Sequence, residues 1–202
     1  MAAVIDEAVG ALRAGRPVIL PTDTVYGLCA DGYREEPARR LYKLKQRPKS
    51  TPVALLAADL DVVLDAVPEL RGRAAVAARA LLPGQYTLVL PNPARRFHWL
   101  CGPDPSAIGV RVPELPPPAR AVLDRVSLVA ATSANLHGGA DPACLEEIPE
   151  ELVRGVGAVV DAGRLPGEPS TVLDLTGPEP RVLREGAAPA AGALERVAAA
   201  LV

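Results

Sequence analysis

Three lysines lie close together in a chain that otherwise uses arginine. They are Lys43, Lys45 and Lys49, and the remaining 19 of the 22 basic residues are arginines. A lysine ammonium is a compact, strongly hydrated point charge of the kind that phosphate sites often use. The cluster is also compatible with a solvated helix face, so both interpretations stay open on this feature alone.

A pair of cations stands where a predicted helix breaks. Lys45 and Arg47 are two residues apart and could not share one face of a continuing helix, but Pro48 ends the helix. Both side chains can then turn toward one phosphate group, and Arg111 and Arg184 at predicted strand ends could add charge. The sequence contains neither GxxxxGK[ST] nor GxGxxG, so a bound nucleotide would use neither common phosphate cradle.

Three polar loops adjoin predicted strands. They span residues 21–24, 132–135 and 168–171 and offer hydroxyl and amide groups with little charge. In open α/β sheets, ligands bind beyond the strand ends, and such groups suit the orientation of a small polar molecule. The same residue types are also the preferred caps and turns, which explains any single loop equally well.

Hydrophobic periodicity and Pro/Gly punctuation predict alternating helices and strands along the whole chain. The predicted helices span 3–14, 36–46, 60–66, 69–82, 116–125, 142–153 and 190–201. The predicted strands span 17–20, 25–30, 52–57, 86–90, 107–112, 127–131, 157–161, 171–175 and 181–184. This alternation favours a three-layer α/β fold with a twisted mixed sheet.

Length and charge limit the class of protein. The 202 residues, 49% hydrophobic and 23% charged, suit one core and one domain. The net charge of -2 differs from the large positive charge that is typical of a dedicated nucleic-acid-binding domain. A local basic groove remains compatible with this charge. No apolar stretch reaches the ~20 residues of a membrane span. Asp6 and Glu7 precede the first basic residue, unlike a secretory signal, so we expect a cytoplasmic protein.

Metal-binding residues are few. The three cysteines, Cys29, Cys101 and Cys144, form no CxxC pair, and the chain has two histidines, which argues against a structural zinc site. The sequence also contains no carboxylate cluster that predicts a dedicated metal cage.

Six segments together resemble one family. Between about residues 6 and 188 the chain resembles the YrdC-like family of L-threonylcarbamoyladenylate synthases. The segments occur in the family's order and are residues 21–28 (PTDTVYGL), 42–48 (YKLKQRP), 109–113 (GVRVP), 132–135 (TSAN), 169–172 (PSTV) and 183–186 (LREG).

The resemblance implies a single YrdC-like catalytic domain over residues 1–202, with a concave ligand-binding face and a C-terminal helix at 190–201. It also implies that the chain lacks the additional C-terminal domain of longer relatives. The implied enzyme is a nucleotidyltransferase that joins ATP, L-threonine and bicarbonate into threonylcarbamoyl-AMP and pyrophosphate, with Mg²⁺ expected alongside ATP. A separate transferase complex would then modify a tRNA adenosine next to the anticodon, and a direct tRNA contact is compatible with this role.

The resemblance also implies roles for individual residues. The implied ATP contacts are Lys45, Arg47, Thr51, Ser133, Asn135 and Arg184, with Lys45 and Arg47 also catalytic. The implied L-threonine contacts are Thr24, Arg111 and Ser170. Three positions depart from the family pattern: Gln85 replaces a proline, His137 replaces a serine, and Leu56 stands where some members have a histidine.

Two other functions fit parts of the sequence. The chain could be a YrdC-like RNA-binding protein, or a carbamoyl-transfer protein without threonine specificity. The six tyrosine, phenylalanine and tryptophan residues are scattered along the sequence and form no evident stacking platform for single-stranded nucleic acid. Pyrophosphate release that requires both threonine and bicarbonate would separate the synthase from these alternatives.

Overall fold

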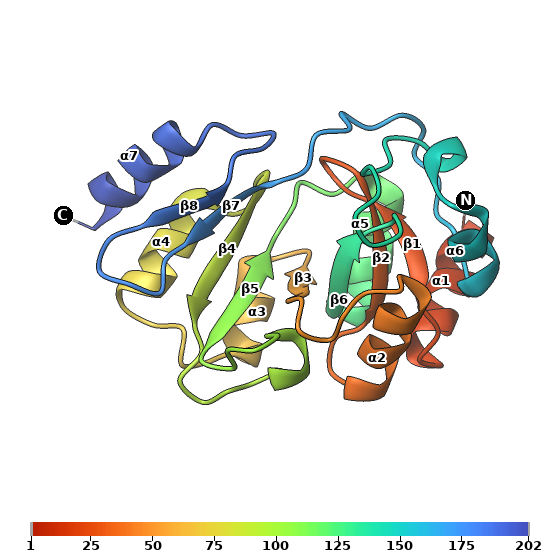
Figure 1. Cartoon of the computed structure of the whole chain (residues 1–202), viewed down its shortest axis with the longest axis horizontal. Helices are drawn as coiled ribbons and strands as arrows, with labels where there is room; N and C mark the ends of the chain where they lie inside the picture. Colours follow the sequence, from red (N-terminus) through yellow and green to blue (C-terminus); the bar gives the residue numbers. More distant parts are fainter. Residues whose placement is uncertain (1, 202) are drawn as a thin grey trace.

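Eight strands form one open mixed sheet in the computed structural model, which describes residues 2–201 (Figure 1). Their order across the sheet is β1-β2-β6-β3-β5-β4-β7-β8, and only the β3–β5 and β4–β7 pairs are parallel. The strands are β1 (Val18–Pro21), β2 (Tyr26–Asp31), β3 (Ala54–Ala57), β4 (Tyr86–Pro91), β5 (Ala107–Arg111), β6 (Leu128–Ser133), β7 (Thr171–Asp174) and β8 (Arg181–Arg184).

The helices connect and cover these strands. They are α1 (Ala2–Arg13), α2 (Glu35–Leu44), α3 (Leu60–Ala66), α4 (Arg73–Leu81), α5 (Pro117–Val126), α6 (Glu150–Gly155) and α7 (Ala190–Ala200), with 3-10 turns η1 (His98–Leu100) and η2 (Leu145–Glu147). Within the described residues, every helix is too short or too polar to cross a lipid bilayer.

Two predicted elements were wrong. The helix predicted over 142–153 is replaced by η2 and the short α6, because Pro149 has no N–H and stands at the N-terminal cap of α6. The strand predicted over 157–161 makes only one bridge, between Val159 and Ile19 of β1. Pro17 and Pro21 flank this bridge and lack the N–H groups that a longer ladder would need.

Helices cover both faces of the sheet at the β1–β2–β6 end. Alternate strand residues point to opposite faces, and here they join different clusters. Val18 and Cys29 pack in a cluster with α1 and α5, whereas Ile19 and Leu28 belong to a larger core that includes α2. This end therefore has the three layers that the sequence predicts.

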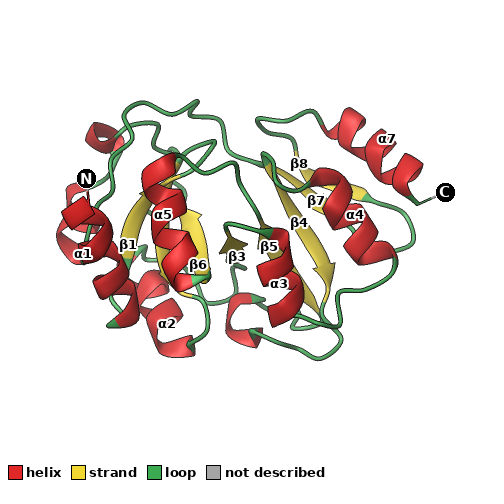
Figure 2. Cartoon of the chain, turned by 180° about the vertical axis from the view of Figure 1, so that it is seen from behind, coloured by secondary structure: helices red, strands yellow, loops and turns green. Residues whose placement is uncertain are grey.

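The other end of the sheet is covered by helices on one face, which Figure 2 shows as α3 and α4. The core-facing residues of β4 and β5 are Leu88, Leu90, Ile108 and Val110. Their neighbours point to the opposite face and line a cavity: Thr87, Val89, Gly109 and Arg111. The predicted α/β fold with a mixed sheet and a concave face is confirmed, and the cavity occupies the place of the third layer at this end.

Candidate active site

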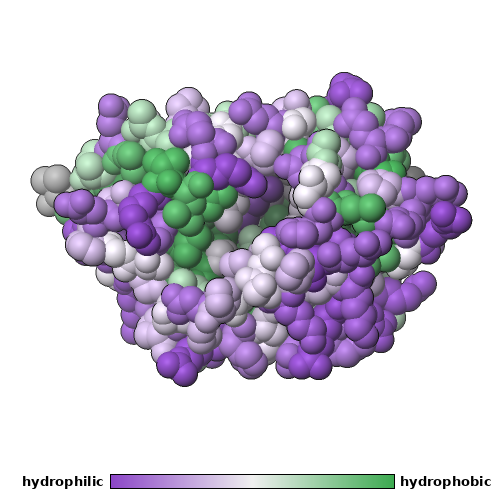
Figure 3. All heavy atoms as spheres, viewed as in Figure 1, coloured by the Kyte–Doolittle hydropathy of each residue, from purple (hydrophilic) through white to green (hydrophobic). Residues whose placement is uncertain are grey.

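A cavity of about 530 Å³ opens on the concave face, and Figure 3 shows the hollow near the middle of the molecule. This volume lies within the range of about 300–1,000 Å³ that is typical of small-molecule sites. The residues predicted for the site that line this cavity are Arg47, Arg111, Ser133, Ser170 and Arg184. They come from the segment after α2 and from β5, β6, β8 and the loop before β7, so the sheet brings together segments that are distant in sequence.

Arg47 reaches the cavity because the chain reverses after α2. Gln46 adopts a left-handed conformation with φ of 53°, and the N–H of Arg47 donates to the carbonyl of Tyr42 at 2.9 Å. The Arg47 guanidinium donates to the Pro52 carbonyl at 2.8 Å, whereas its buried Nε has no partner. Burial, the largest cause, lowers the pKa of Arg47. The predicted helix break thus turns this cation toward the cavity.

Lys45 lies behind the cavity wall and is only 1% exposed. Its ammonium donates to the carbonyl of Ser133 at 2.6 Å, to the carbonyl of Asn135 at 2.9 Å and to Asn135 Oδ1. Burial, followed by repulsion from Arg47, lowers its pKa to about 8. Three acceptors use the three N–H groups of the ammonium. In this conformation Lys45 holds the loop after β6, so the expected direct approach of Lys45 to a phosphate is not what the geometry shows.

The loop after β6 is fixed by its own side chains. Ser133 Oγ donates to Asn135 Oδ1 at 2.7 Å, and Asn135 Nδ2 donates to the carbonyl of Gly139. The N–H of Ala134 donates to the carbonyl of Tyr26 at 2.8 Å. Ser133 lines the cavity, whereas Asn135 is buried behind it. The loop is therefore anchored by contacts within the chain itself.

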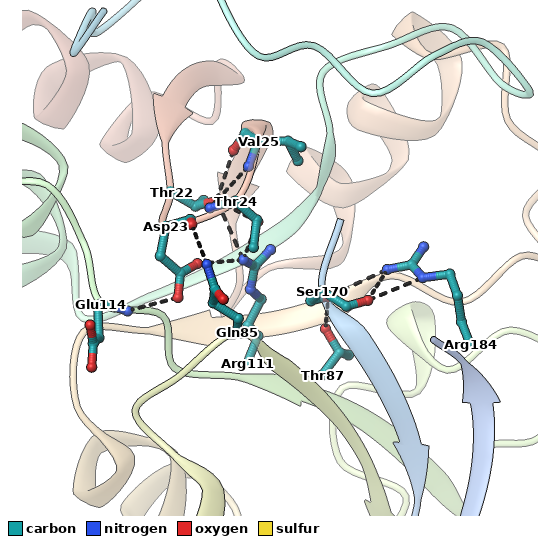
Figure 4. Close-up of polar contacts among 10 residues, drawn as sticks. All are labelled: Thr22, Asp23, Thr24, Val25, Gln85, Thr87, Arg111, Glu114, Ser170 and Arg184. Atoms are coloured by element: carbon teal, nitrogen blue, oxygen red, sulfur yellow. Dashed lines mark hydrogen bonds and ion pairs between the residues drawn. The ribbon is translucent and has the colours of Figure 1, made fainter. Parts of the chain in front are cut away.

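Arg111 is held by the loop between β1 and β2, as Figure 4 shows. Its Nη2 lies 2.6 Å from Asp23 Oδ1 and also donates to the hydroxyl of Thr24. Both charged side chains are nearly buried, with 11% of Arg111 and 8% of Asp23 exposed. Burial is the largest cause of a lowered Arg111 pKa, which the Asp23 charge opposes. Arg111 Nε is buried without a partner.

A second polar wall faces the cavity from β4, β7 and β8. Ser170 Oγ lies 2.8 Å from the hydroxyl of Thr87. Arg184 clamps the Ser170 carbonyl with two N–H groups, from Nε at 3.1 Å and Nη2 at 2.7 Å (Figure 4). Gly186 permits this arrangement, because a Cβ there would lie 2.2 Å from the carbonyl oxygen of Pro169.

Two predicted contacts lie outside the cavity lining. The backbone N–H of Thr51 donates to the Pro48 carbonyl at 3.0 Å, and its carbonyl accepts from the hydroxyl of Tyr42 at 3.1 Å. Thr51 is adjacent in sequence to Pro52, which does line the cavity. Thr24 is fully buried and contacts Arg111 from behind.

Sequence reasoning assigned no firm role to several residues at the site. The sequence indicates Asp23 only as one member of the polar loop 21–24, yet it is the charged partner of Arg111. Its position inside residues 21–28 was the available signal. Asp141 lines the cavity, and its charge acts on Lys45, but no local pattern marks it.

The unpartnered donors indicate what the cavity can bind. Among the described residues, the buried side-chain polar atoms without a hydrogen-bond partner are Arg47 Nε, Arg111 Nε and Trp99 Nε1. Buried donors normally have partners, so each exception calls for an explanation. Both guanidiniums line the same cavity, and a guanidinium matches the geometry of phosphate and carboxylate groups. The cavity therefore has the donors to accept two anionic groups.

Comparison with protein families identifies relatives over nearly the whole chain. The Sua5/YciO/YrdC family model, described as "Telomere recombination", matches residues 10–186. A Mycobacterium tuberculosis H37Rv protein named putative threonylcarbamoyl-AMP synthase is 36% identical over 185 residues, which cover 90% of this chain and 83% of the relative. The Pyrococcus abyssi threonylcarbamoyl-AMP synthase is 32% identical over 186 residues, which cover 90% of this chain and 54% of the relative.

Solved structures give the same result. The structure of P. abyssi Sua5 complexed with L-threonine is similar, with a TM-score of 0.85 and 30% identity over 96% of this chain and 56% of that one. This chain thus spans little more than half of the P. abyssi protein. Escherichia coli YciO is similar with a TM-score of 0.82 and 28% identity, over 94% of this chain and 92% of that one. The sequence motifs, the sheet and these relatives together show that the chain belongs to the Sua5/YciO/YrdC family.

Proposed function

We propose that this chain is a threonylcarbamoyl-AMP synthase, which converts ATP, L-threonine and bicarbonate into threonylcarbamoyl-AMP and pyrophosphate. One observation carries the proposal. Arg47 and Arg111, each with a buried Nε that has no hydrogen-bond partner among the described residues, line a single cavity. One anionic group would be the ATP phosphates and the other the carboxylate of the amino acid. The names of the mycobacterial and archaeal relatives support the same activity.

The ATP end of the cavity would be formed by Arg47, Ser133 and Arg184. Arg47 and Arg184 would neutralise phosphate charge, and the Ser133 hydroxyl, which donates to Asn135 Oδ1 in the structure, could turn to donate to a phosphate oxygen at the same wall. Lys45 and Asn135 would act indirectly. Both hold the Ser133 loop in place, and the Lys45 ammonium also adds positive charge next to it. Thr51, next to the cavity-lining Pro52, would contact the nucleotide.

The threonine end would be formed by Arg111, Thr24 and Ser170. The Arg111 guanidinium would donate to the threonine carboxylate, while Thr24 and Asp23 keep it in place. Ser170, on the opposite wall, would bind a polar group of the same amino acid. A neutral hydroxyl suits this position because it can donate or accept.

The reaction needs positioning more than a protein nucleophile. The threonine amine attacks bicarbonate or dissolved CO₂ and forms an N–C bond, which gives a carbamate, with water released when bicarbonate reacts. A carbamate oxygen then attacks the α-phosphorus of ATP, and the bond to the pyrophosphate leaving group breaks. Arg47 and Arg184 would stabilise the charge that develops on the phosphates.

Mg²⁺ is expected to enter with ATP. Within residues 2–201, no group of three or more His, Cys, Asp or Glu side chains is placed to hold a metal ion. Mg²⁺ commonly binds substrate phosphates and water with few protein ligands, which fits this donor set. When bound, the ion would neutralise negative charge on the pyrophosphate.

The product would serve tRNA modification. We propose that residues 1–202 act as one catalytic domain in the cytoplasm, and that a separate transferase complex moves the threonylcarbamoyl group to a tRNA adenosine next to the anticodon. The three free cysteines suit a reducing compartment. Threonylcarbamoyl-AMP is a mixed anhydride, so a group-transfer step must consume it.

The decisive experiment measures pyrophosphate release from ATP by the purified protein. We expect release only when L-threonine and bicarbonate are both present, with threonylcarbamoyl-AMP detected by mass spectrometry. Release that needs bicarbonate but accepts any amino acid would support carbamoyl transfer without threonine specificity. Binding of tRNA without any pyrophosphate release would support the RNA-binding alternative.

A further inference from the structure

Gln85 connects the two walls of the cavity. It stands immediately before β4, and its Nε2 donates to the backbone carbonyl of Asp23 at 2.8 Å (Figure 4). Its own carbonyl accepts the N–H of Thr171, the first residue of β7, at 3.1 Å. One residue is therefore bonded through its side chain to the β1–β2 loop and through its backbone to β7.

Asp23 and Thr171, the two residues to which Gln85 is bonded, each adjoin one wall of the threonine end of the cavity. Asp23 holds Arg111 at 2.6 Å on the first wall. On the second wall, Thr171 follows Ser170, whose hydroxyl lies 2.8 Å from that of Thr87, two residues after Gln85. The link through Gln85 therefore runs from the neighbour of Ser170 to the partner of Arg111.

The Gln85 bond restrains a part of Asp23 that its other contacts leave free. The Asp23 carboxylate receives Arg111 on one oxygen and the N–H of Glu114 on the other, at 3.1 Å. Among the described residues, Gln85 is the group that donates to the Asp23 backbone carbonyl. Without this bond the loop keeps its side-chain anchors and the bond from the Gly167 N–H to the Thr24 carbonyl at 2.9 Å, but the Asp23 backbone loses its attachment to the segment before β4 and can shift.

We propose that Gln85 is a positioning residue that sets the spacing between the Arg111 wall and the Ser170 wall, and thereby the preference for threonine over serine. The inference rests on the proposed function. Threonine and serine differ by one methyl group. A pocket whose walls fit such a group closely binds the amino acid that carries it about tenfold or more tightly than the one that lacks it. A shift of the Asp23 backbone would widen the site and weaken the contact with that methyl group first.

Two substitutions test the role of the amide donor. Gln85→Met keeps the length of the side chain and removes the donor, whereas Gln85→Lys restores an N–H donor at similar length. As a matched control, Arg13→Met removes another bond from a side chain to a backbone carbonyl, from Arg13 Nη2 to Arg125 at 3.1 Å, away from the cavity lining. Titration calorimetry then measures the Kd of each protein for L-threonine, L-serine and ATP separately.

For Gln85→Met we expect the threonine Kd to rise about three- to tenfold, the range for loss of one neutral hydrogen bond. The serine Kd should rise less, the ATP Kd should stay within about twofold, and Gln85→Lys should recover most of the threonine affinity. The control should leave all three Kd values unchanged.

Three results would overturn the inference: an unchanged ratio of the threonine and serine Kd values, equal weakening of threonine and ATP, or no recovery in Gln85→Lys. Equal weakening together with a lower Tm would assign Gln85 a purely structural role. A wild-type protein that binds neither threonine nor ATP would instead contradict the proposed function, so the two failures are distinguishable.

Discussion

Replacement of Lys45 by methionine tests whether this lysine holds the Ser133 loop or contacts ATP. Methionine has a similar length and no donor, so the buried carbonyls of Ser133 and Asn135 lose bonds of 2.6 and 2.9 Å. A buried acceptor without a partner costs about 1–3 kcal/mol. Part of this loss is offset, because the burial that lowers the Lys45 pKa to about 8 also penalises its charge. We expect a net loss of about 1–3 kcal/mol in the free energy of unfolding.

The measurement combines thermal unfolding with ATP binding. For a chain of this size, about 1 kcal/mol corresponds to about 2–4 °C, so the Tm of Lys45→Met should fall by about 3–10 °C. ATP should bind at least about tenfold more weakly, because the loop that carries Ser133 loses its anchor. Arg47→Met is the matched comparison. Arg47→Met loses the bond to the Pro52 carbonyl, which is exposed to solvent, so we expect a similar loss of ATP affinity with a smaller fall in Tm, of at most about 4 °C.

The pH dependence of stability provides a second measurement. The folded pKa of Lys45, about 8, lies below the ordinary value of 10.5. Between these values the unfolded chain holds a proton that the folded chain has lost, so Lys45 makes the free energy of unfolding rise with pH across this window. Urea unfolding at pH 7 and pH 10 should therefore show wild type gaining stability relative to Lys45→Met. An unchanged Tm in Lys45→Met together with weaker ATP binding would refute the positioning role and favour direct contact with ATP.

Two further substitutions test the walls of the cavity. Asp23→Asn removes the charge that compensates the nearly buried Arg111, and by the usual cost of breaking such a pair it should lower the free energy of unfolding by about 3 kcal/mol in urea titrations; a loss below about 1 kcal/mol would show that solvent screens the pair. Gly186→Ala should lower both Tm and pyrophosphate release, because the new Cβ would lie 2.2 Å from the Pro169 carbonyl oxygen and must push the Ser170 segment away. Gly10→Ala in α1, where a Cβ meets nothing within 4 Å, is its control and should be neutral or stabilising.

Local signals in the sequence were sufficient to predict most elements and the polar loops. Proline and glycine positions, hydrophobic periodicity and the break before Pro48 act over a few residues, so they can be recognised without a fold. These signals failed where a distant partner decides the outcome. The segment at 157–161 has a strand-like pattern, but it bridges only Ile19, because Pro17 and Pro21 on either side of this residue have no N–H to donate.

The order of the strands decided how the site is built. Lys45 and Arg47 are equivalent in the sequence, two cations on either side of one residue. In the fold, Lys45 meets the backbone of Ser133, 88 positions away, and is buried, whereas Arg47 faces the cavity. The same holds for Arg111 and Asp23, which are 88 positions apart in the sequence and 2.6 Å apart in space. Such contacts follow from which strands pair across the sheet, and no local pattern encodes that choice.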